Sequence, residues 1–419
     1  MTLPALLATA VLAQAGGPPW LNGQSQPEDL EVWLVTFGPG DTVPEWWGHT
    51  GLVVQDRRLN QGRLYNYGMF AFDEGFLARF VKGRLDFWVG EDPILPTFHL
   101  YKSLDRDVRI QELNLTPIQS LEIAHALATN VLPQNRMYLY DHYRDNCSTR
   151  PRDILDRAVG GQLGEATRSP ARLTLRELTR KYSRVSPPML FVLDFMQNDL
   201  LDKPMPQTGE AFLPDELERQ VQNLQLRRDD GTMVPAVKRE WNWYTAHRPA
   251  VPEEPPHWTP ALLGLGVALA ALALALGHWG RGGKRLPRVL LGLEISLLGL
   301  TWGLLGTALV LGWAFTNNLV THHNENLFFA NPLTLAALPC GVMFIFGSSR
   351  GRRALFWLWI PLGVTAVLGI LAKAVPWFDQ NNWNVMALIA PVNLGFAALF
   401  WLDRRSRAAG QSPPLPPPP

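Results

Sequence analysis

The sequence predicts an exported α+β domain followed by an all-α membrane domain of five transmembrane helices. A short apolar segment at the N-terminus ends in a small-x-small site, and five later segments are long and apolar enough to cross a bilayer. Charged residues concentrate before the first of these five segments. The 419-residue chain is 18% charged with a net charge of +1, which argues against a basic nucleic-acid binder.

The N-terminal segment, residues 1–15, reads MTLPALLATAVLAQA. Its apolar stretch is too short for a spanning helix, and it ends in Ala13-Gln14-Ala15, which is typical of a cleavable secretory signal. Because the segment has no Lys or Arg, an uncleaved N-terminal anchor is the alternative. Both interpretations export the residues that follow.

The exported domain, residues 16–160, is predicted to begin with strands. The strand candidates are rich in β-branched and aromatic residues or alternate in polarity, and they are 31–38, 50–56, 64–70, 85–90 and 106–115. Thr116 and Gln119 have capping-box spacing, so a helix is expected from there to residue 130. A strand over 137–143 and a helix that stops at Gly160 complete the domain.

Residues 161–258 are mostly polar and contain many prolines. We expect them to form a less regular extension of the exported domain and a linker to the membrane.

The membrane domain is predicted over residues 259–403. Its spans are expected at 259–279, 289–315, 327–347, 354–375 and 384–402. Basic residues cluster after the first, third and fifth spans, whereas the connections 316–326 and 376–383 contain no Lys or Arg. The positive-inside rule therefore predicts a cytoplasmic C-terminus, with a basic and then Pro-rich tail over 404–419, and an exported N-terminal domain.

The candidate nucleophile is Cys147. The chain has two cysteines, and because Cys340 falls in the third predicted span, Cys147 has no disulfide partner in the exported domain. Cys147 lies between a predicted strand and a helix, where the helix N-terminus, Arg144 and Arg150 would lower its pKa. The alternative is a buried structural cysteine.

The candidate base is His49, at the entry of a predicted strand between Gly48 and Gly51. Glycines allow the backbone and a substrate to approach closely. The exported part contains five other histidines, so this choice depends on the glycine-flanked turn alone, and a structural histidine is the alternative.

The order of a histidine, a strand and then a cysteine resembles permuted papain-like hydrolases and acyltransferases of the NlpC and lecithin:retinol acyltransferase type. More specifically, the chain resembles Lnb-type bacterial lipoprotein N-acyltransferases in four segments, WGHTGLVV, LYNYGMF, FVKGRLDFWV and YLYDHYRDNCSTRPRDIL. The segments FMQNDLLDKP, THHNEN and NNWN also resemble that family. The resemblance covers roughly residues 28–402. A departure from a regular helix start is Pro151, which lacks an N–H in the first turn after Cys147.

The resemblance implies a permuted papain-like exported domain in the periplasm, anchored in the bacterial inner membrane. It implies that Cys147 is the nucleophile, that His49 is the base and that Asn66 orients the imidazole. The implied reaction moves a fatty acyl chain from a phospholipid through a Cys thioester to the amine of a diacylglyceryl lipoprotein. Neither a cofactor nor a metal is expected.

Substrate contacts are predicted at two places. Asn146 and Arg150, beside the nucleophile, are candidates for oxyanion or substrate binding. In the outer connection His322, His323, Asn324 and Asn326 would form a polar surface for lipid headgroups or the acceptor amine. A plain solvated loop is the alternative, and a metal site is disfavoured because adjacent side chains of an extended segment point in opposite directions.

Two other functions remain open at this point. The same fold supports a periplasmic cysteine peptidase or amidase that acts on cell-wall peptides. A catalytically inactive domain that binds lipoproteins is the second alternative. Fold alone does not decide among them.

Overall fold

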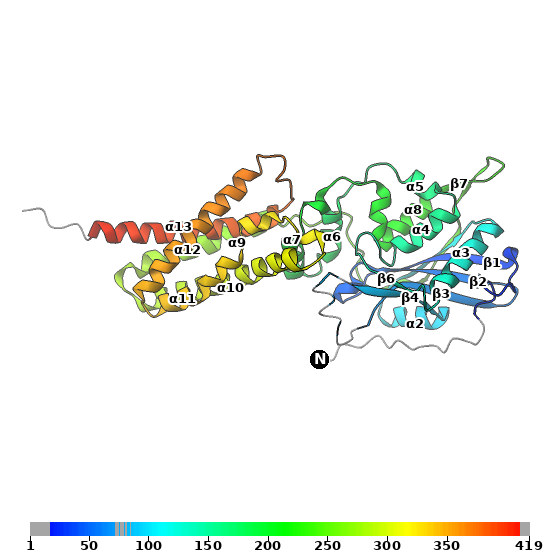
Figure 1. Cartoon of the computed structure of the whole chain (residues 1–419), viewed down its shortest axis with the longest axis horizontal. Coiled ribbons are helices and arrows are strands. Elements are labelled where there is room, and N and C mark those ends of the chain that lie inside the picture. The colour runs from blue at the N-terminus through cyan, green and yellow to red at the C-terminus, as the bar shows by residue number, and fades with distance from the viewer. Residues whose placement is uncertain (1–16, 72–74, 76–78, 80–81, 84, 411–419) are drawn as a thin grey trace, which may run out of the picture. The chain divides into compact units, whose positions relative to one another are not determined.

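The computed structural model describes residues 17–71, 75, 79, 82–83 and 85–410 (Figure 1). The predicted signal peptide, residues 1–15, lies outside this part of the chain. The chain divides into two compact units. The first unit comprises residues 1–80, 84–178 and 204–252, and the second comprises 81–83, 179–203 and 253–419.

A seven-stranded antiparallel sheet forms the centre of the first unit, with the strand order β6-β4-β3-β2-β1-β5-β9. The strands are β1 (Leu30–Phe37), β2 (His49–Asp56), β3 (Gln61–Met69), β4 (Asp86–Asp92), β5 (Val108–Leu113), β6 (Met137–Leu139) and β9 (Val237–Tyr244). The five strands predicted before residue 116 are therefore confirmed. The predicted strand 137–143 is shorter than expected, because the chain leaves the sheet after Leu139.

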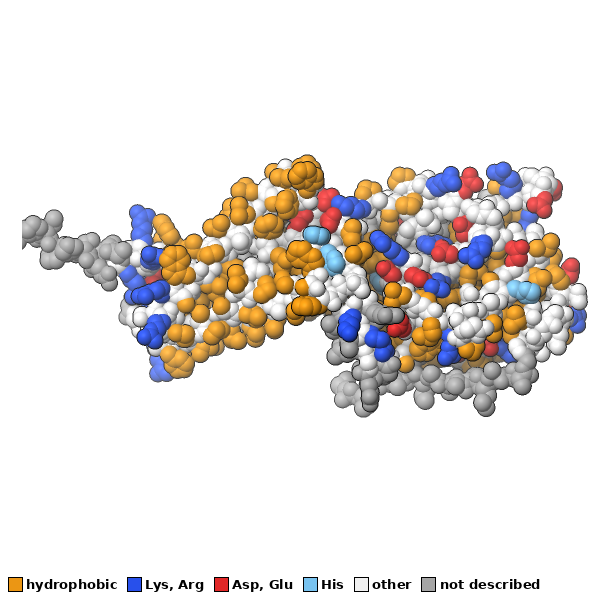
Figure 2. All heavy atoms as spheres, viewed as in Figure 1, with side chains coloured by type: hydrophobic (Ala, Val, Ile, Leu, Met, Phe, Trp, Pro, Cys, Tyr) orange, Lys and Arg blue, Asp and Glu red, His pale blue; other side chains and the backbone are white. Residues whose placement is uncertain are grey.

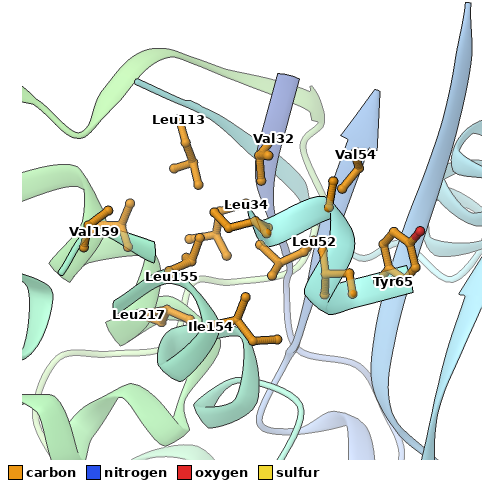
Figure 3. Packing of buried hydrophobic residues seen from close by; sticks show 14 of the residues in the cluster. Val32, Leu34, Leu52, Val54, Tyr65, Leu113, Ile154, Leu155, Val159 and Leu217 are labelled. Atoms are coloured by element: carbon orange, nitrogen blue, oxygen red, sulfur yellow. The ribbon is translucent and has the colours of Figure 1, made fainter. Parts of the chain in front are cut away.

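The sheet is covered on both faces, because successive side chains of a strand point in opposite directions. One face packs against helices α3 (Pro117–Asn130), α4 (Thr149–Ala158) and α8 (Pro214–Asn223) through a core that Figure 3 shows from close by. The other face carries a smaller cluster beneath α2 (Ile94–Ser103), which contains Phe37 and Phe98. Helix α3 begins with the predicted capping box of Thr116 and Gln119.

Residues 161–258 are more regular than the sequence indicated. They contain α5 (Gln162–Ala166), α6 (Leu175–Ser183), α7 (Pro187–Met196), α8, β7 (Gln225–Arg227), β8 (Met233–Pro235) and β9. Strand β9 pairs with β5 and completes the sheet, although residues 114–236 separate the two strands in the sequence. Residues 179–203 belong to the second unit, whereas 161–178 and 204–252 belong to the first.

The second unit consists mainly of helices with the length and hydropathy of membrane spans. Four qualify singly, and they are α9 (Thr259–Trp279), α10 (Arg285–Phe315), α12 (Ser349–Ala372) and α13 (Trp383–Gly410). The segment predicted as the third span is a pair of helical pieces, Leu319–Phe328 and Pro332–Ile345, bent by 56°. Hydrophobic side chains dominate the surface of this unit in Figure 2.

The bend in the third span has a local cause. Pro332 disfavours helical backbone at the residue before it, and Asn331 is accordingly extended, with φ −142° and ψ 170°. The Asn331 side chain then accepts a hydrogen bond from the Leu333 N–H and starts the second helical piece.

Glycines on α10 allow this bent segment to approach closely. A Cβ at Gly303 would lie 2.5 Å from the Leu335 backbone nitrogen, and a Cβ at Gly306 would lie 2.5 Å from the Asn331 Cα. Small residues permit such backbone contact between membrane helices.

We therefore expect Gly303→Ala to destabilise the protein by about 1–3 kcal/mol, because the added methyl group meets the Leu335 backbone nitrogen as well as the Leu335 side chain, and the backbone cannot move aside as a side chain can. Thermal unfolding in detergent measures the effect. Gly264→Ala on α9 is the matched control, since a Cβ there meets open space and should leave the unfolding temperature unchanged or slightly raised. Equal unfolding temperatures for the two variants would contradict the close packing.

Candidate active site

His49 is the first residue of β2, and the turn before it depends on glycine. Gly48 has a φ of +77°, and a Cβ there would lie 2.9 Å from the Phe37 carbonyl oxygen. The His49 ring stacks near Phe37 and Tyr101, with ring-centroid distances of 5.9 and 6.3 Å. This aromatic surrounding fixes the imidazole at the end of the sheet.

Asn66 on β3 contacts the imidazole as predicted. Its Oδ1 lies 3.1 Å from His49 Nε2, while its Nδ2 donates to Asp92 Oδ2 at 2.9 Å. Because a carboxylate only accepts hydrogen bonds, Asp92 fixes the orientation of the Asn66 amide. Nε2 of His49 must then carry the proton and donate to Oδ1, which leaves Nδ1 as the unprotonated nitrogen of the neutral ring.

Cys147 lies two residues before the first residue of α4, next to the ends of β2 and β3. Hydrogen bonds from the backbone N–H of Thr50 and of Cys147 itself reach the thiol. A Cβ at Gly68, where φ is +85°, would lie 3.3 Å from the Cys147 Cβ. The structure thus brings together the nucleophile predicted from sequence and the strand end that carries His49.

Asn146 organises the turn before α4. Its Oδ1 accepts from the N–H groups of Ser148 and Thr149, and its Nδ2 donates to the carbonyl oxygens of His142 and Phe212. Its own backbone N–H donates to Thr149 Oγ1. These contacts give Asn146 a structural role, so we do not retain it as an oxyanion donor.

The charges around the thiol differ from the sequence-based expectation. Arg150 forms an ion pair with Asp145 and lies 3.8 Å above the centroid of the Tyr138 ring. Arg106 is the cation that favours the thiolate, and its buried guanidinium donates to the Gly38 carbonyl and to Glu45.

The effect of burial on the pKa of Cys147 is larger than that of the groups that favour the thiolate. Burial raises the pKa of Cys147 to about 11, although the Thr50 and Cys147 N–H groups and Arg106 act in the opposite direction. The expectation of a lowered pKa is therefore wrong for the free protein. Burial also lowers the pKa of His49 to about 4, with a smaller contribution from Arg106 and an opposing one from the Asn66 hydrogen bond. At neutral pH the site holds a thiol and a neutral imidazole.

We expect alkylation of Cys147 by iodoacetamide, measured by intact mass in a Cys340→Ala protein, to accelerate about tenfold per pH unit between pH 7 and 10. Only the thiolate reacts, and its fraction grows tenfold per unit below a pKa of about 11. The urea-unfolded protein is the control, and its rate should level off near the ordinary cysteine pKa of about 8.5. A plateau below pH 8 in the folded protein would show a thiolate in the free site.

Three groups at this site were missed from the sequence: Asp92, Arg106 and the Thr50 N–H. Asp92 ends β4 and Arg106 precedes β5, and neither lies in a motif near His49 or Cys147. Alternation along the strands places Asn66 and His49 on one face, but only the pairing of β2 with β3 and of β3 with β4 brings Asp92 to Asn66.

The outer residues His322, His323, Asn324 and Asn326 belong to the second unit. His322 Nε2 lies 3.2 Å from the Thr316 carbonyl oxygen, and the His323 ring lies 5.0 Å from that of Trp313. Asn324 and Asn326 are buried, and each donates to the Phe195 carbonyl oxygen. Within the described ranges, no three His, Cys, Asp or Glu side chains gather as metal ligands would.

These features define the first unit as a mixed α/β domain with a cysteine and a histidine at one end of its sheet, on a chain that also carries membrane-spanning helices. Residues 17–181 match the family model of the Lnb N-terminal periplasmic domain. Residues 17–181 are therefore similar to the periplasmic domain of the Lnb family, and over these residues the resemblance stated from the motifs is confirmed. The match includes His49, Asn66, Asp92, Arg106 and Cys147.

No curated protein and no solved structure matches the chain significantly. The family match and the spans together support an inner-membrane protein with a periplasmic N-terminal domain.

Proposed function

We propose that this protein moves a fatty acyl chain from a membrane phospholipid, through a thioester on Cys147, to the N-terminal amine of a diacylglyceryl-cysteine lipoprotein. The observation that carries the proposal is the hydrogen-bonded series His49–Asn66–Asp92 beside the Cys147 thiol, which accepts from the N–H of Thr50, the residue after His49. All of these residues lie in the part of the chain that matches the Lnb periplasmic domain. In this proposal the domain is a permuted papain-like one, because the strand with the base precedes the helix with the nucleophile. The basic C-terminal end lies in the cytoplasm.

Acylation begins with Cys147 as a neutral thiol and His49 as a neutral imidazole. His49 Nδ1 takes the proton of the Cys147 thiol as the sulfur attacks the ester carbonyl carbon of the phospholipid, so the thiolate exists only during attack. The N–H groups of Cys147 and Thr50 are the nearest backbone donors for the resulting oxyanion. Collapse of this intermediate breaks the ester C–O bond, and protonated His49 gives its proton to the departing lysophospholipid oxygen.

Transfer to the acceptor requires a neutral amine. A free α-amino group has a pKa of ~7.7–8.0, whereas the pKa of His49 is about 4. His49 is therefore too weak a base to deprotonate a free ammonium group. It accepts a proton from the nitrogen only after the amine has attacked the thioester carbonyl and become more acidic. The thiolate then leaves and recovers a proton from His49.

Membrane attachment fits this substrate class. Both the acyl donor and the acceptor are held in the bilayer by acyl chains, and each buried CH₂ contributes about 0.8 kcal/mol to that anchoring. A domain fused to membrane spans meets such substrates without extracting them into water, which a hydrolase of soluble cell-wall peptides would not need.

Intact-protein mass spectrometry tests the proposal. The detergent-purified protein is incubated with phospholipid and then with a diacylglyceryl-cysteine peptide. We expect a fatty-acyl adduct on the protein that disappears when the peptide is added and reappears as an N-acyl group on the peptide. Absence of the adduct together with release of cell-wall peptides would favour the cysteine peptidase instead. Absence of both activities would favour a binding protein.

A further inference from the structure

Helix α7, Pro187–Met196, is short and apolar and belongs to the second unit. Its sequence, PPMLFVLDFM, contains a single charged residue, Asp194. That side chain is 2% exposed and accepts from Arg180 Nε at 2.8 Å and from Asn384 Nδ2 at 2.7 Å. The helix is therefore free of unpaired charge along its whole length.

Helix α7 packs on two of the spans. Phe195 is fully buried in a cluster that includes Leu309 of α10 and Val385 of α13. The Phe191 and Trp302 rings have centroids 6.3 Å apart.

The position of Trp302 along α10 indicates the depth of this contact. Trp302 lies 14 residues beyond Arg288, the last basic residue at the inner end, or about 21 Å at 1.5 Å per residue. Leu309 lies about 32 Å from the same point. Because the hydrocarbon core is about 30 Å thick, Leu309 falls near its far boundary and Trp302 about 10 Å inside it.

Side chains of the second unit donate hydrogen bonds to the backbone carbonyl groups at the C-terminal end of α7. The Phe195 carbonyl oxygen accepts from Asn326 Nδ2 at 2.8 Å and from Asn324 Nδ2 at 3.1 Å, and the Gln197 carbonyl oxygen accepts from Gln380 Nε2 at 2.9 Å. In water these carbonyl groups could bind solvent, but in lipid each needs an internal partner.

The remaining face of α7 is apolar and partly exposed. Met189, Val192 and Leu193 follow the i, i+3, i+4 spacing of one helix face and are half-buried. They face away from the inward set formed by Leu190, Asp194 and Phe195, which is buried. Apolar side chains of α10, such as Leu304 and Leu311, are likewise exposed.

We propose that α7 is a sixth membrane-inserted element, which enters the leaflet opposite the basic connections without crossing the bilayer. Its outward face then contacts the acyl chains of phospholipids. This inference does not depend on the catalytic proposal, since it rests on packing within the second unit.

Bimane fluorescence tests the insertion in full-length protein reconstituted into phosphatidylcholine vesicles. Single cysteines are introduced at Val192 on α7, at Val185 just before it and at Leu297 on the exposed side of α10, in a Cys147→Ala, Cys340→Ala background. Val185 and Leu297 are 67% and 65% exposed, so they serve as references for water and lipid. Each labelled protein is then exposed to lipids brominated in their acyl chains and to aqueous iodide.

We expect brominated lipid to quench the label at Val192 as strongly as the label at Leu297, and iodide to quench only the label at Val185. Val192→Cys keeps a small side chain, and Met189→Cys on the same face provides a second, independent position. Quenching of both α7 labels by iodide would overturn the proposal. The proposal would also be overturned if neither brominated lipid nor iodide quenched the two α7 labels, because this face would then be covered by protein.

Discussion

Cys147→Ala is expected to abolish the acyl adduct and to lower N-acylation of the lipoprotein peptide by roughly 10⁴-fold or more, as loss of a nucleophile does in other covalent enzymes. The thiol is the group on which the backbone N–H donors of Thr50 and Cys147 converge. Removing the sulfur leaves no atom at this position to carry the acyl group. Intact mass of the protein and mass of the peptide product measure the two losses separately.

Cys340→Ala is the matched control, because this second free thiol lies in the bent third span and not in the domain that carries His49. It should leave both the adduct and the product unchanged. Cys147→Ser tests the nucleophile itself, since a hydroxyl of the same shape is a much weaker nucleophile and should transfer acyl groups far more slowly. An adduct on the Cys147→Ala protein would contradict the assignment of the thioester.

His49→Ala is expected to lower acyl-enzyme formation by about 10²–10⁴-fold, the usual contribution of a general base. Asn66→Ala should cost less, roughly 10–100-fold, by analogy with the loss of partners that orient metal-bound histidines. The Asn66 amide then no longer holds the proton on Nε2, so the tautomer with a free Nδ1 is less populated. To measure these rates, the reaction is quenched at successive times and the fraction of acylated protein is determined from its intact mass.

Asp92→Ala separates a positioning role from a structural one. Asp92 touches Asn66 and not the imidazole, so its loss should free the amide to rotate and lower the rate by less than Asn66→Ala does. A double Asn66→Ala, Asp92→Ala variant should then be no slower than Asn66→Ala alone, because Asp92 acts on His49 only through Asn66. Additive losses would contradict that arrangement.

His125→Ala controls for the loss of a histidine from this domain. His125 is exposed on α3, away from the described contacts of His49, and its variant should acylate at the wild-type rate. A His49→Ala protein as active as His125→Ala would exclude His49 as the base.

The sequence by itself determined most of the strands, the helix from Thr116 and the four regular spans, and it predicted His49, Asn66 and Cys147 as the site residues. These features follow from local patterns, namely side-chain alternation, capping spacing and long apolar runs, and from motifs that lie within short segments. The family resemblance depended in addition on the order in which the motif segments follow one another along the chain. Apart from this order, which runs along the chain, each of these signals is local in the sequence.

The tertiary structure decided the electrostatics of the site and the assignment of residues 161–258. The pKa of Cys147 depends on burial, which is the sum of contacts from segments distant in sequence, so the helix start and the nearby arginines predicted the wrong direction. Asp92 and Arg106 reach the site through strand pairing. Residues 179–203 join the spans, because polar groups at the C-terminal end of α7 find partners there: Asn326 donates to the Phe195 carbonyl oxygen, and Asn384 at the start of α13 donates to Asp194. Hydrogen-bond partners of this kind leave no periodic signal in the sequence.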